Sequence, residues 1–326
     1  MPQKRKSYWT KLINASFKAV LIIMILPLSL CACAHTDMVR TKCLKQAAPA
    51  DDSVRVTWMG TAGLFVSDGD TGIYIDPFVS RYGLLKVGFG VALKPQNSLI
   101  DEWITLTRGQ NAAAILVSHS HYDHVMDVPR FALKTGAMIV GSKTTANVAL
   151  GAGIPENRIK IIADRDKMTF GKFEVTFIGS IHSPALFGKI PWPGTLEYPL
   201  PQPAPASAYR EGGVYAIFVK HPKGTFLHYG SPGVKPGIFE GISADVVFLS
   251  IGGRKDTGSL IDHVLTPLTP KTVIPIHFDD LFGPVDKEIK PLIGVDLNEF
   301  WTRTAKTEGA FTVNTLPVGE ERVLFY

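Results

Sequence analysis

Cysteine is scarce in this sequence: three cysteines occur in 326 residues, and two of them, Cys31 and Cys33, lie near the N-terminus. Beyond residue 33 only Cys43 remains. This excludes an intrachain disulfide in the body of the protein, so the fold must depend on its hydrophobic core.

Acidic residues are missing from the first 33 positions, which carry only basic charges: Lys4, Arg5, Lys6, Lys11 and Lys18. Taking these five from the 34 Lys and Arg leaves 29, which equals the 29 Asp and Glu of the chain. The sequence pI of about 9.0 therefore reflects the N-terminal segment. The near-neutral remainder excludes a broad basic surface for nucleic acid.

The basic segment is followed by an apolar run over residues 19–30 that contains no charged residue. This run is too short to span a bilayer and has the length typical of a secretory signal. Its end, "LSLCAC", resembles a bacterial lipobox in which Cys33 receives lipid. We therefore predict a signal peptide over residues 1–33 and a lipid-anchored protein that faces the periplasm of the bacterial cell envelope. The alternative is secretion after cleavage behind Ala34.

Residues 34–52 are polar and without pattern, and they are expected to form a flexible tether. The remainder, 53–326, has the length of a single layered α/β domain. Two stretches in it follow the same plan, "SVRVTWMGTAGLFVSDGDTGIYIDPF" and "GGVYAIFVKHPKGTFLHYGSPG". Each combines apolar runs with a turn rich in Gly, Pro or Asp, which predicts a hairpin. Helix-like and strand-like segments alternate between them. The pattern predicts an α/β sandwich of two similar halves with helices outside.

The stretch "AAAILVSHSHYDHV" places four metal-binding side chains directly after a predicted buried strand: His119, His121, Asp123 and His124. Neutral imidazole and carboxylate are the ligands that Zn²⁺ and similar divalent ions prefer. Open α/β sheets gather their functional sites just beyond the carboxyl ends of strands. This spacing of histidines and an aspartate therefore predicts a metal site.

Two further histidines follow apolar runs in the same manner. His182 ends "FEVTFIGSIH", and His277 ends "KTVIPIH". We predict that both join the site. The remaining histidines lack this setting and are interpreted as tether, turn or surface residues: His35, His221, His228 and His263.

The chain resembles the metallo-β-lactamase superfamily, and within it the branch of ascorbate-phosphate-lactonase-like and phospholipase-D-like hydrolases. The resemblance rests on "TWMGTAGLFV", "IYIDPF", "HSHYDH", "SIHS", "ADVVFLSIGG" and "VIPIHFDD". It implies a four-layer αββα sandwich and hydrolytic chemistry. It also implies two ligand sets, His119, His121 and His182 for one metal, and Asp123, His124 and His277 for the other. Asp76 would brace the ligand loop by orienting an imidazole.

Such a site predicts hydrolysis of an ester-type bond in a phosphodiester, lactone or carboxylic ester. One or two Zn²⁺ ions, with Mn²⁺ or Fe²⁺ as alternatives, would convert bound water into hydroxide near neutral pH. Asp123 is the candidate catalytic residue, because it could steer that hydroxide or take its proton. Neither Ser118 nor Ser120, which flank the ligands, lies in a GxSxG nucleophile elbow.

Ser231 departs from the family pattern. Related proteins usually carry an aspartate here that bridges both ions, whereas "FLHYGSPG" offers a hydroxyl, which is a weaker ligand for a divalent ion. Asp256, Asp279 or Asp280 could supply a substitute carboxylate. The alternative to an enzyme is a catalytically decayed binding or scaffold protein of the same fold at the cell envelope.

A Pro-rich insertion at about 183–213 follows His182 and contains several large apolar residues. One interpretation is a rigid excursion that covers a sheet edge. The other is a lid that offers an apolar wall to a small-molecule or lipid-like substrate, with residues 81–95 as a second wall. The sequence indicates no oligomeric state.

Overall fold

The computed structural model describes residues 42–44, 50, 52–185, 188–285, 289–307 and 309–326. The predicted signal peptide with Cys33 lies outside the described residues, and so does most of the predicted tether. The compact unit begins at Lys42, earlier than the expected start at residue 53. Its first residues are held against a late segment, because the Thr315 amide donates to the Lys42 carbonyl and the Leu44 amide donates to the Thr315 carbonyl, each at 2.9 Å.

The described residues form two mixed sheets of seven strands each. In the first sheet, the neighbours from β14 through β1 and β2 to β3 pair antiparallel, and those from β3 to β6 pair parallel. In spatial order this sheet contains β14 (Glu321–Phe325), β1 (Val54–Trp58), β2 (Leu64–Ser67), β3 (Gly72–Ile75), β4 (Ala114–Leu116), β5 (Met138–Gly141) and β6 (Ile159–Ile161).

The second sheet repeats this plan. An antiparallel pair, β9 and β10, leads into the parallel neighbours β10 to β13. In spatial order the sheet contains β13 (Thr312–Val313), β12 (Thr272–Ile276), β11 (Val246–Ser250), β10 (Gly224–Tyr229), β9 (Val214–His221), β8 (Phe173–Ser180) and β7 (Lys167–Phe170). The two predicted hairpins are β2–β3 and β9–β10, which confirms the expectation of two similar halves.

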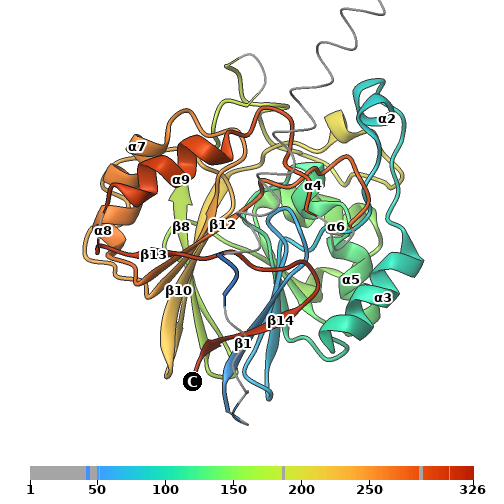
Figure 1. Cartoon of the computed structure of the whole chain (residues 1–326). Coiled ribbons are helices and arrows are strands. Elements are labelled where there is room, and N and C mark those ends of the chain that lie inside the picture. The colour runs from blue at the N-terminus through green and yellow to red at the C-terminus, as the bar shows by residue number, and fades with distance from the viewer. Residues whose placement is uncertain (1–41, 45–49, 51, 186–187, 286–288, 308) are drawn as a thin grey trace, which may run out of the picture. The chain divides into compact units, whose positions relative to one another are not determined.

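Helices cover the outer face of each sheet. Figure 1 shows α7, α8 and α9 at the left, beside the second sheet. It shows α3 and α5 at the right, beside the first sheet. The helices are α2 (Leu84–Gly88), α3 (Asn97–Thr107), α4 (Tyr122–Val125), α5 (Val128–Thr135), α6 (Lys143–Gly151), α7 (Thr257–Leu260), α8 (Thr266–Leu268) and α9 (Leu297–Ala305). A π-helical turn, Ile261–Leu265, joins α7 to α8, and single 3-10 turns occur at Glu156–Arg158 and Ala206–Ala208. The four-layer αββα sandwich is confirmed.

The local sequence accounts for these elements. In α3, Ile100, Trp103, Ile104 and Thr107 are buried, and their spacing of three or four residues places them on one face of the helix. The strands β4 and β11 are buried along their whole length, as expected for parallel strands covered on both faces. None of the helices in the described ranges combines the length and apolar character needed to cross a membrane.

The Pro-rich insertion packs along α6. The Asn147 side chain donates to the Leu196 carbonyl at 2.7 Å, and the Leu200 amide donates to the Asn147 carbonyl at 3.0 Å. Gly151 makes this close approach possible, because a Cβ at this position would lie 2.0 Å from the Leu200 carbonyl oxygen. The insertion therefore covers a helix beside the first sheet and is fixed there by backbone hydrogen bonds.

Candidate metal centre

The loop after β4 places its polar side chains between the two sheets. The strand ends at Leu116, and the chain turns through residues 117–121 into the short helix α4. His119, His121 and His124 are all buried. This loop lies at the carboxyl ends of the parallel strands, where such sheets place their sites.

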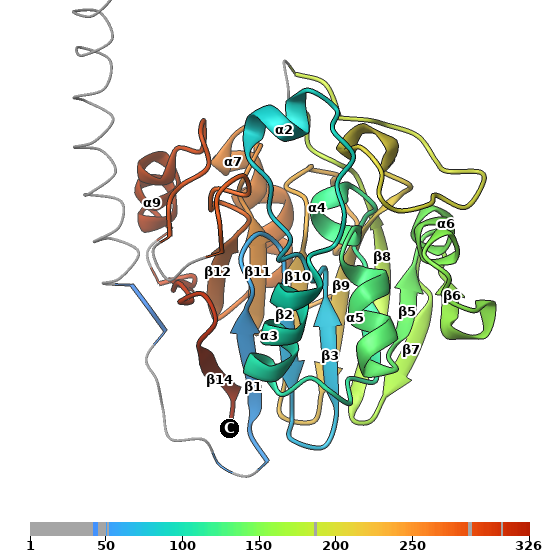
Figure 2. The same cartoon turned by 90° about the vertical axis from the view of Figure 1, so that its right-hand side faces the viewer.

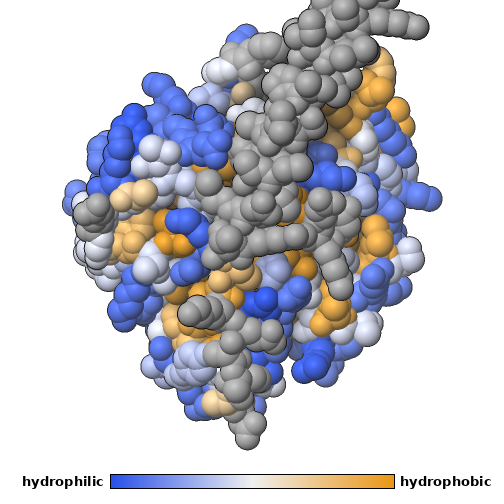
Figure 3. All heavy atoms as spheres, viewed as in Figure 1, coloured by the Kyte–Doolittle hydropathy of each residue, from blue (hydrophilic) through white to orange (hydrophobic). Residues whose placement is uncertain are grey.

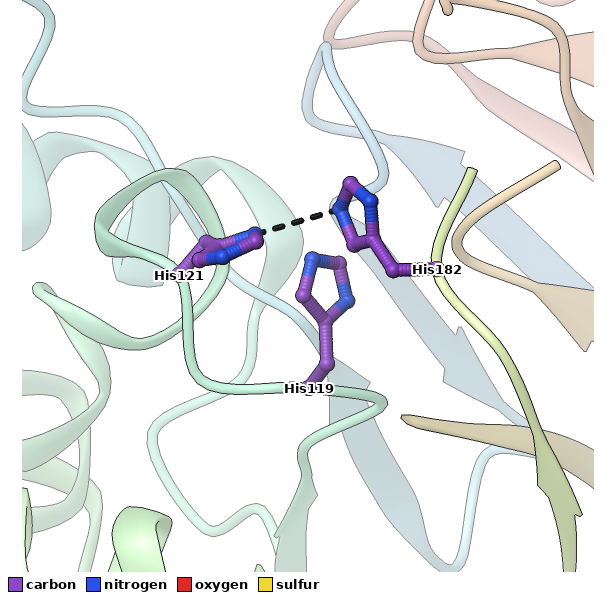
Figure 4. Close-up of side chains that lie close together, drawn as sticks. All are labelled: His119, His121 and His182. Carbon is purple, nitrogen blue, oxygen red and sulfur yellow. Dashed lines mark hydrogen bonds between the residues drawn. The ribbon is translucent and has the colours of Figure 1, made fainter. Parts of the chain in front are cut away.

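The first group of candidate ligands is His119, His121 and His182, which come from this loop and from the segment after β8. The three imidazoles converge on one another, as Figure 4 shows. Their candidate ligand atoms lie within 4.8 Å of one another. Nδ1 of His121 lies 3.1 Å from Nε2 of His182.

Backbone carbonyls fix which nitrogen each of two rings presents. Nε2 of His121 donates to the Pro191 carbonyl at 2.7 Å, so its Nδ1 is left for a ligand. Nδ1 of His182 donates to the Ser183 carbonyl at 2.6 Å, so its Nε2 is left in the same way. Carbonyl acceptors of this kind set the tautomer of metal-binding histidines.

The second group is Asp123, His124 and His277, whose ligand atoms also lie within 4.8 Å of one another. Nε2 of His277 lies 3.2 Å from Nε2 of His124 and 3.2 Å from Oδ2 of Asp123. His277 directly follows β12 in a left-handed conformation, with φ of 56°, and its amide donates to the Thr61 carbonyl at 2.8 Å. The structure thus brings together all six residues that the sequence predicted as ligands, in two sets.

These spacings suit ions that bind nitrogen and oxygen. Two nitrogens bound to Zn²⁺ at about 2.0 to 2.1 Å in tetrahedral geometry lie roughly 3.3 Å apart. The closest contacts are 3.1 Å in the first group and 3.2 Å in the second. The side chains therefore stand near the separation that a shared ion requires.

One buried atom in the first group lacks a partner. Nε2 of His119 is buried and makes no hydrogen bond within the described residues. A buried polar atom left unpaired costs about 1–3 kcal/mol, and a cation held with His121 and His182 would remove that cost. The donor set and this unpaired nitrogen together fit a divalent ion.

Burial keeps the first group uncharged. It lowers the pKa of His121 to about 4 and that of His182 to about 3, and it lowers the pKa of His119 well below its usual value. Neighbouring imidazoles lower the pKa values of His119 and His182 further. Because only a neutral imidazole binds a metal, these residues are ready to act as ligands at neutral pH.

The second group contains opposite charges. Burial opposes ionisation of Asp123, but His124 and His277 hold the pKa of its carboxyl well below the usual range. Burial also opposes the charging of His124, and the carboxylates of Asp76 and Asp123 nevertheless raise its pKa. The group therefore contains an ionised carboxylate, and its surroundings favour a positive charge. A bound cation would supply that charge.

Asp76 connects β3 to this loop. Its Oδ1 accepts from the Ser118 amide at 2.7 Å, and its Oδ2 accepts from Nδ1 of His124 at 2.8 Å and from the Ser118 hydroxyl. Asp76 is fully buried and has a left-handed φ of 44°, which aspartate tolerates better than most residues. One carboxylate therefore orients a candidate ligand and the backbone of the loop.

Ser231 is buried beside the first group. Its hydroxyl accepts from the Ser183 amide at 3.2 Å, next to His182. The three aspartates considered as substitutes belong to neither candidate group. Asp279 is bound to Arg81 at 2.7 Å and to the Thr61 amide, Asp280 accepts from the Phe282 amide, and Asp256 caps α7.

His228 was interpreted wrongly from the sequence, and His221, which ends β9 directly before the hairpin turn, is more buried than expected. His228 is fully buried on β10, donates from Nε2 to the Ala62 carbonyl at 2.8 Å, and lies 4.0 Å from Asp76. His221 is also buried, with its Nε2 3.2 Å from Oδ2 of Asp68. Neither is a surface residue. The sequence signal was their place in apolar strands, within β10 for His228 and at the end of β9 for His221. His263 is exposed, as expected, and His35 lies outside the described residues.

The Pro-rich insertion reaches the first group. Besides the bond from His121 to the Pro191 carbonyl, the Trp192 ring lies 6.2 Å from the His121 ring and 6.0 Å from the Tyr122 ring, edge-on to both. The Glu211 carbonyl accepts from the Ser120 amide at 2.8 Å. The sequence did not reveal these backbone acceptors, because every residue type carries the same backbone carbonyl.

Comparison with known proteins agrees with this picture. A model of the beta-lactamase superfamily domain matches residues 55–277. A UPF0173 metal-dependent hydrolase of Myxococcus xanthus is 29% identical over 243 residues, covering 71% of this chain and 73% of that protein. One of Rhizobium etli is 27% identical over 132 residues, covering 40% of this chain. The match spans only about half, 49%, of that relative's length.

Solved structures share the architecture at low sequence identity. The metallo hydrolase Igni18 of Ignicoccus hospitalis is 16% identical with a TM-score of 0.55, covering 84% of this chain and 99% of that one. The metallo-beta-lactamase fold protein YhfI of Bacillus subtilis is 14% identical with a TM-score of 0.52, covering 83% and 99%. The family match extends over most of both sheets and includes all six candidate ligands. The chain belongs to the metallo-β-lactamase superfamily.

Proposed function

We propose that this protein is a metal-dependent hydrolase that cleaves an ester-type bond in a phosphodiester, a lactone or a carboxylic ester. The observation that carries the proposal is the convergence of six metal-binding side chains into two groups, each with ligand atoms within 4.8 Å of one another. Similarity to proteins named metal-dependent hydrolases supports it. The residues that would hold the ions are His119, His121 and His182 in one set, and Asp123, His124 and His277 in the other.

His119, His121 and His182, with Asp123, His124 and His277, would hold divalent ions whose chemistry would be to polarise the scissile carbonyl or phosphoryl group and to lower the pKa of water from about 15.7 to about 7. The protein itself contributes proton handling. Asp123 is ionised at neutral pH, since His124 and His277 keep the pKa of its carboxyl well below the usual range, so the carboxylate can accept a hydrogen bond from the attacking water and steer it. Asp76 accepts hydrogen bonds from His124 and from the Ser118 amide, and these bonds fix the loop that carries Asp123.

We propose Zn²⁺ as the ion, with Mn²⁺ or Fe²⁺ as alternatives, since imidazole and carboxylate suit all three. The first group is the stronger site. Its three imidazoles are neutral at physiological pH, and two are oriented by backbone carbonyls. Ser231 gives no negative charge to offset the repulsion between two ions, so the second ion is held more weakly.

The substrate is proposed to be lipid-like. Trp192 lies edge-on to His121 and provides an apolar surface at the rim of the candidate site. Residues 81–95 contact the same insertion, because Leu93 and Ala204 exchange backbone hydrogen bonds. A lipid anchor on Cys33, with the protein at the bacterial cell envelope, would place this rim near acyl chains.

A second candidate function is a decayed binding or scaffold protein. Ser231 favours it, because a hydroxyl stands where the family pattern usually has a bridging carboxylate. The two candidates differ in metal content and in turnover.

The test uses the purified full chain. We would measure its metal content and its turnover of short-chain and long-chain carboxylic esters, an acyl lactone and a phosphodiester. Tightly bound metal and turnover that is lost with a chelator and restored by Zn²⁺ are expected. A metal-free protein that stays inert after Zn²⁺ is added would support the scaffold function instead.

The lipid-like substrate has its own test. Trp192→Ala should reduce kcat/KM for the long-chain ester more than for the short-chain ester, since the apolar surface is lost. Tyr198→Ala is the matched control, because Tyr198 lies in the same insertion and is 82% exposed. Equal losses on both substrates would remove the support for an apolar wall.

A further inference from the structure

The segment over residues 83–92 forms an exposed apolar tip around α2. Four large apolar side chains are turned to solvent there: Leu84 is 50% exposed, Leu85 73%, Phe89 80% and Val91 45%. Figure 3 shows hydrophobic residues gathered at the upper right, where α2 lies in Figure 1. Single exposed apolar residues are common, but a cluster of this kind marks a binding surface.

The charged residues within this segment have one sign. The stretch "RYGLLKVGFGVALKP", residues 81–95, contains Arg81, Lys86 and Lys94 and no acidic residue. Arg81 is tied to Asp279, whereas Lys86 and Lys94 are exposed. The Lys86 ammonium lies 4.2 Å from the centroid of the Tyr82 ring. Apolar side chains beside exposed lysines, without an acidic residue among them, are typical of segments that enter the interface of an anionic membrane.

The base of the tip is anchored, so the apolar side chains are held outward. Val87 and Leu93 are buried, and Leu93 pairs with Ala204 of the Pro-rich insertion at 2.9 and 3.1 Å. The Tyr82 hydroxyl donates to the Lys94 carbonyl at 2.7 Å and closes the segment at its two ends. The tip therefore presents its side chains without a large loss of conformational freedom on binding.

We propose that residues 83–92 insert into the surface of an anionic lipid bilayer and dock this end of the protein on it. Lysines favour this partner over an apolar groove of another protein, because phosphate headgroups surround the acyl chains that would receive Leu85 and Phe89. Figure 2 shows α2 at the same end of the described unit as α4, which carries Asp123 and His124. Docking would therefore bring the candidate metal centre close to the bilayer. Only the supply of lipid substrate to that centre rests on the proposed function.

A local fluorescence reporter tests the insertion in the full chain, independently of any lipid anchor. The Phe89→Trp variant would be mixed with vesicles of phosphatidylglycerol and phosphatidylcholine, with and without brominated acyl chains. The matched control is Tyr326→Trp, because Tyr326 is 63% exposed and the C-terminus lies at the opposite end from α2 in Figure 2. Signals are compared with the unsubstituted chain, which contains five native tryptophans.

We expect the emission of Phe89→Trp to shift to the blue and to be quenched by brominated chains on anionic vesicles, with no such change for Tyr326→Trp. Adding Leu85→Glu to Phe89→Trp should weaken the vesicle titration at least tenfold. Absence of quenching, or equal quenching of both reporters, would overturn the proposal. A blue shift that appears without vesicles and grows with protein concentration would also overturn it, because a second copy of the chain would then cover the tip.

The outcome can be separated from that of the hydrolase proposal. Quenching in a protein without hydrolytic activity would retain the docking surface and reject the hydrolase. Hydrolysis without quenching would retain the hydrolase and reject the docking surface.

Discussion

Nδ1 of His124 lies 2.8 Å from Oδ2 of Asp76, and both side chains are buried. This contact commits Nδ1 as a donor, so Nε2 is the atom that His124 presents to Asp123 and His277. The same carboxylate accepts from the Ser118 amide at 2.7 Å. Asp76 therefore fixes the orientation of the His124 ring and the position of the backbone that leads to His119.

Asp76→Asn should weaken metal binding by about 10- to 100-fold, the usual effect of losing a carboxylate that orients a ligand. The amide keeps the shape but replaces one acceptor oxygen with a donor, which opposes either the bond from the Ser118 amide or the bond from His124. Competition against a fluorescent chelator would measure the change. Asp70→Asn is the control, because the Asp70 side chain is 78% exposed. Unchanged affinity in Asp76→Asn would mean that His124 is oriented by other groups.

His119→Ala and His121→Ala should each remove most of the bound metal and reduce activity to traces, because each deletes one of three nitrogens in the first group. Metal analysis of the purified variants would show the loss. The exposed His263→Ala is the control. His221→Ala, which the sequence would have suggested as neutral, is unsuitable because His221 is buried against Asp68. Full metal content and rate in either ligand variant would show that the site is assigned wrongly.

Asp127 makes stability depend on pH. It is buried, and burial raises the pKa of its carboxyl to about 6, although the amides of Val79 and Ser80 donate to its Oδ2 at 2.8 Å. The other oxygen, Oδ1, has no partner within the described residues. Since the folded pKa lies above the ordinary aspartate value of 3.8, the folded state holds this proton more tightly than the unfolded chain. The contribution of Asp127 to stability is therefore present below pH 4 and falls as pH rises to about 6.

Asp127→Asn removes this titration. Its amide oxygen can still accept from both amides, and it stays neutral at every pH. Relative to wild type, the free energy of unfolding of the variant should therefore rise by about 2 kcal/mol between pH 4.5 and pH 7, which is the larger part of the roughly 3 kcal/mol expected over the whole titration. Urea unfolding of both proteins, kept metal-free with a chelator, measures this difference in the free energy of unfolding. A difference that stays constant over this pH range would contradict the assignment.

The sequence predicted the candidate ligands because each follows an apolar run, and parallel strands end at a common edge. His277 appears after the parallel strand β12 for this reason. His182 follows β8, which pairs antiparallel with both neighbours but runs in the same direction as β10. His228 was misread, since it lies within a strand that is buried on both faces, where alternation carries no signal. The bond between Arg81 and Asp279 spans 198 positions and has no local signature at all.

Covalent lipid on Cys33 remains a prediction, based on "LCAC" behind a basic and apolar leader. In bacteria grown with labelled palmitate, Cys33→Ser should abolish incorporation into the protein, because the acceptor thiol is gone. Cys31→Ser is the control and should retain the label. Label that persists in Cys33→Ser would place the lipid elsewhere, and no label in wild type would favour simple secretion.

We predict that Ser231 determines how many ions the protein holds. Its hydroxyl accepts from the Ser183 amide at 3.2 Å, beside His182, and neither Asp279 nor Asp280 joins a candidate ligand group. We expect purified wild type to contain closer to one tightly bound ion than two, held by the first group. The second ion should load only with excess metal, because no bridging anion offsets the repulsion between two cations.

Ser231→Asp should increase metal retention against a chelator and move the content toward two ions per chain, because a carboxylate at this position adds the missing negative charge. Ser231→Asn is the matched control. It has nearly the same size as aspartate but no charge, so it should leave metal content near that of wild type. Metal analysis after stepwise dialysis against a chelator compares all three proteins. If wild type already retains two ions as firmly as Ser231→Asp, another group bridges them and the role given to Ser231 is wrong.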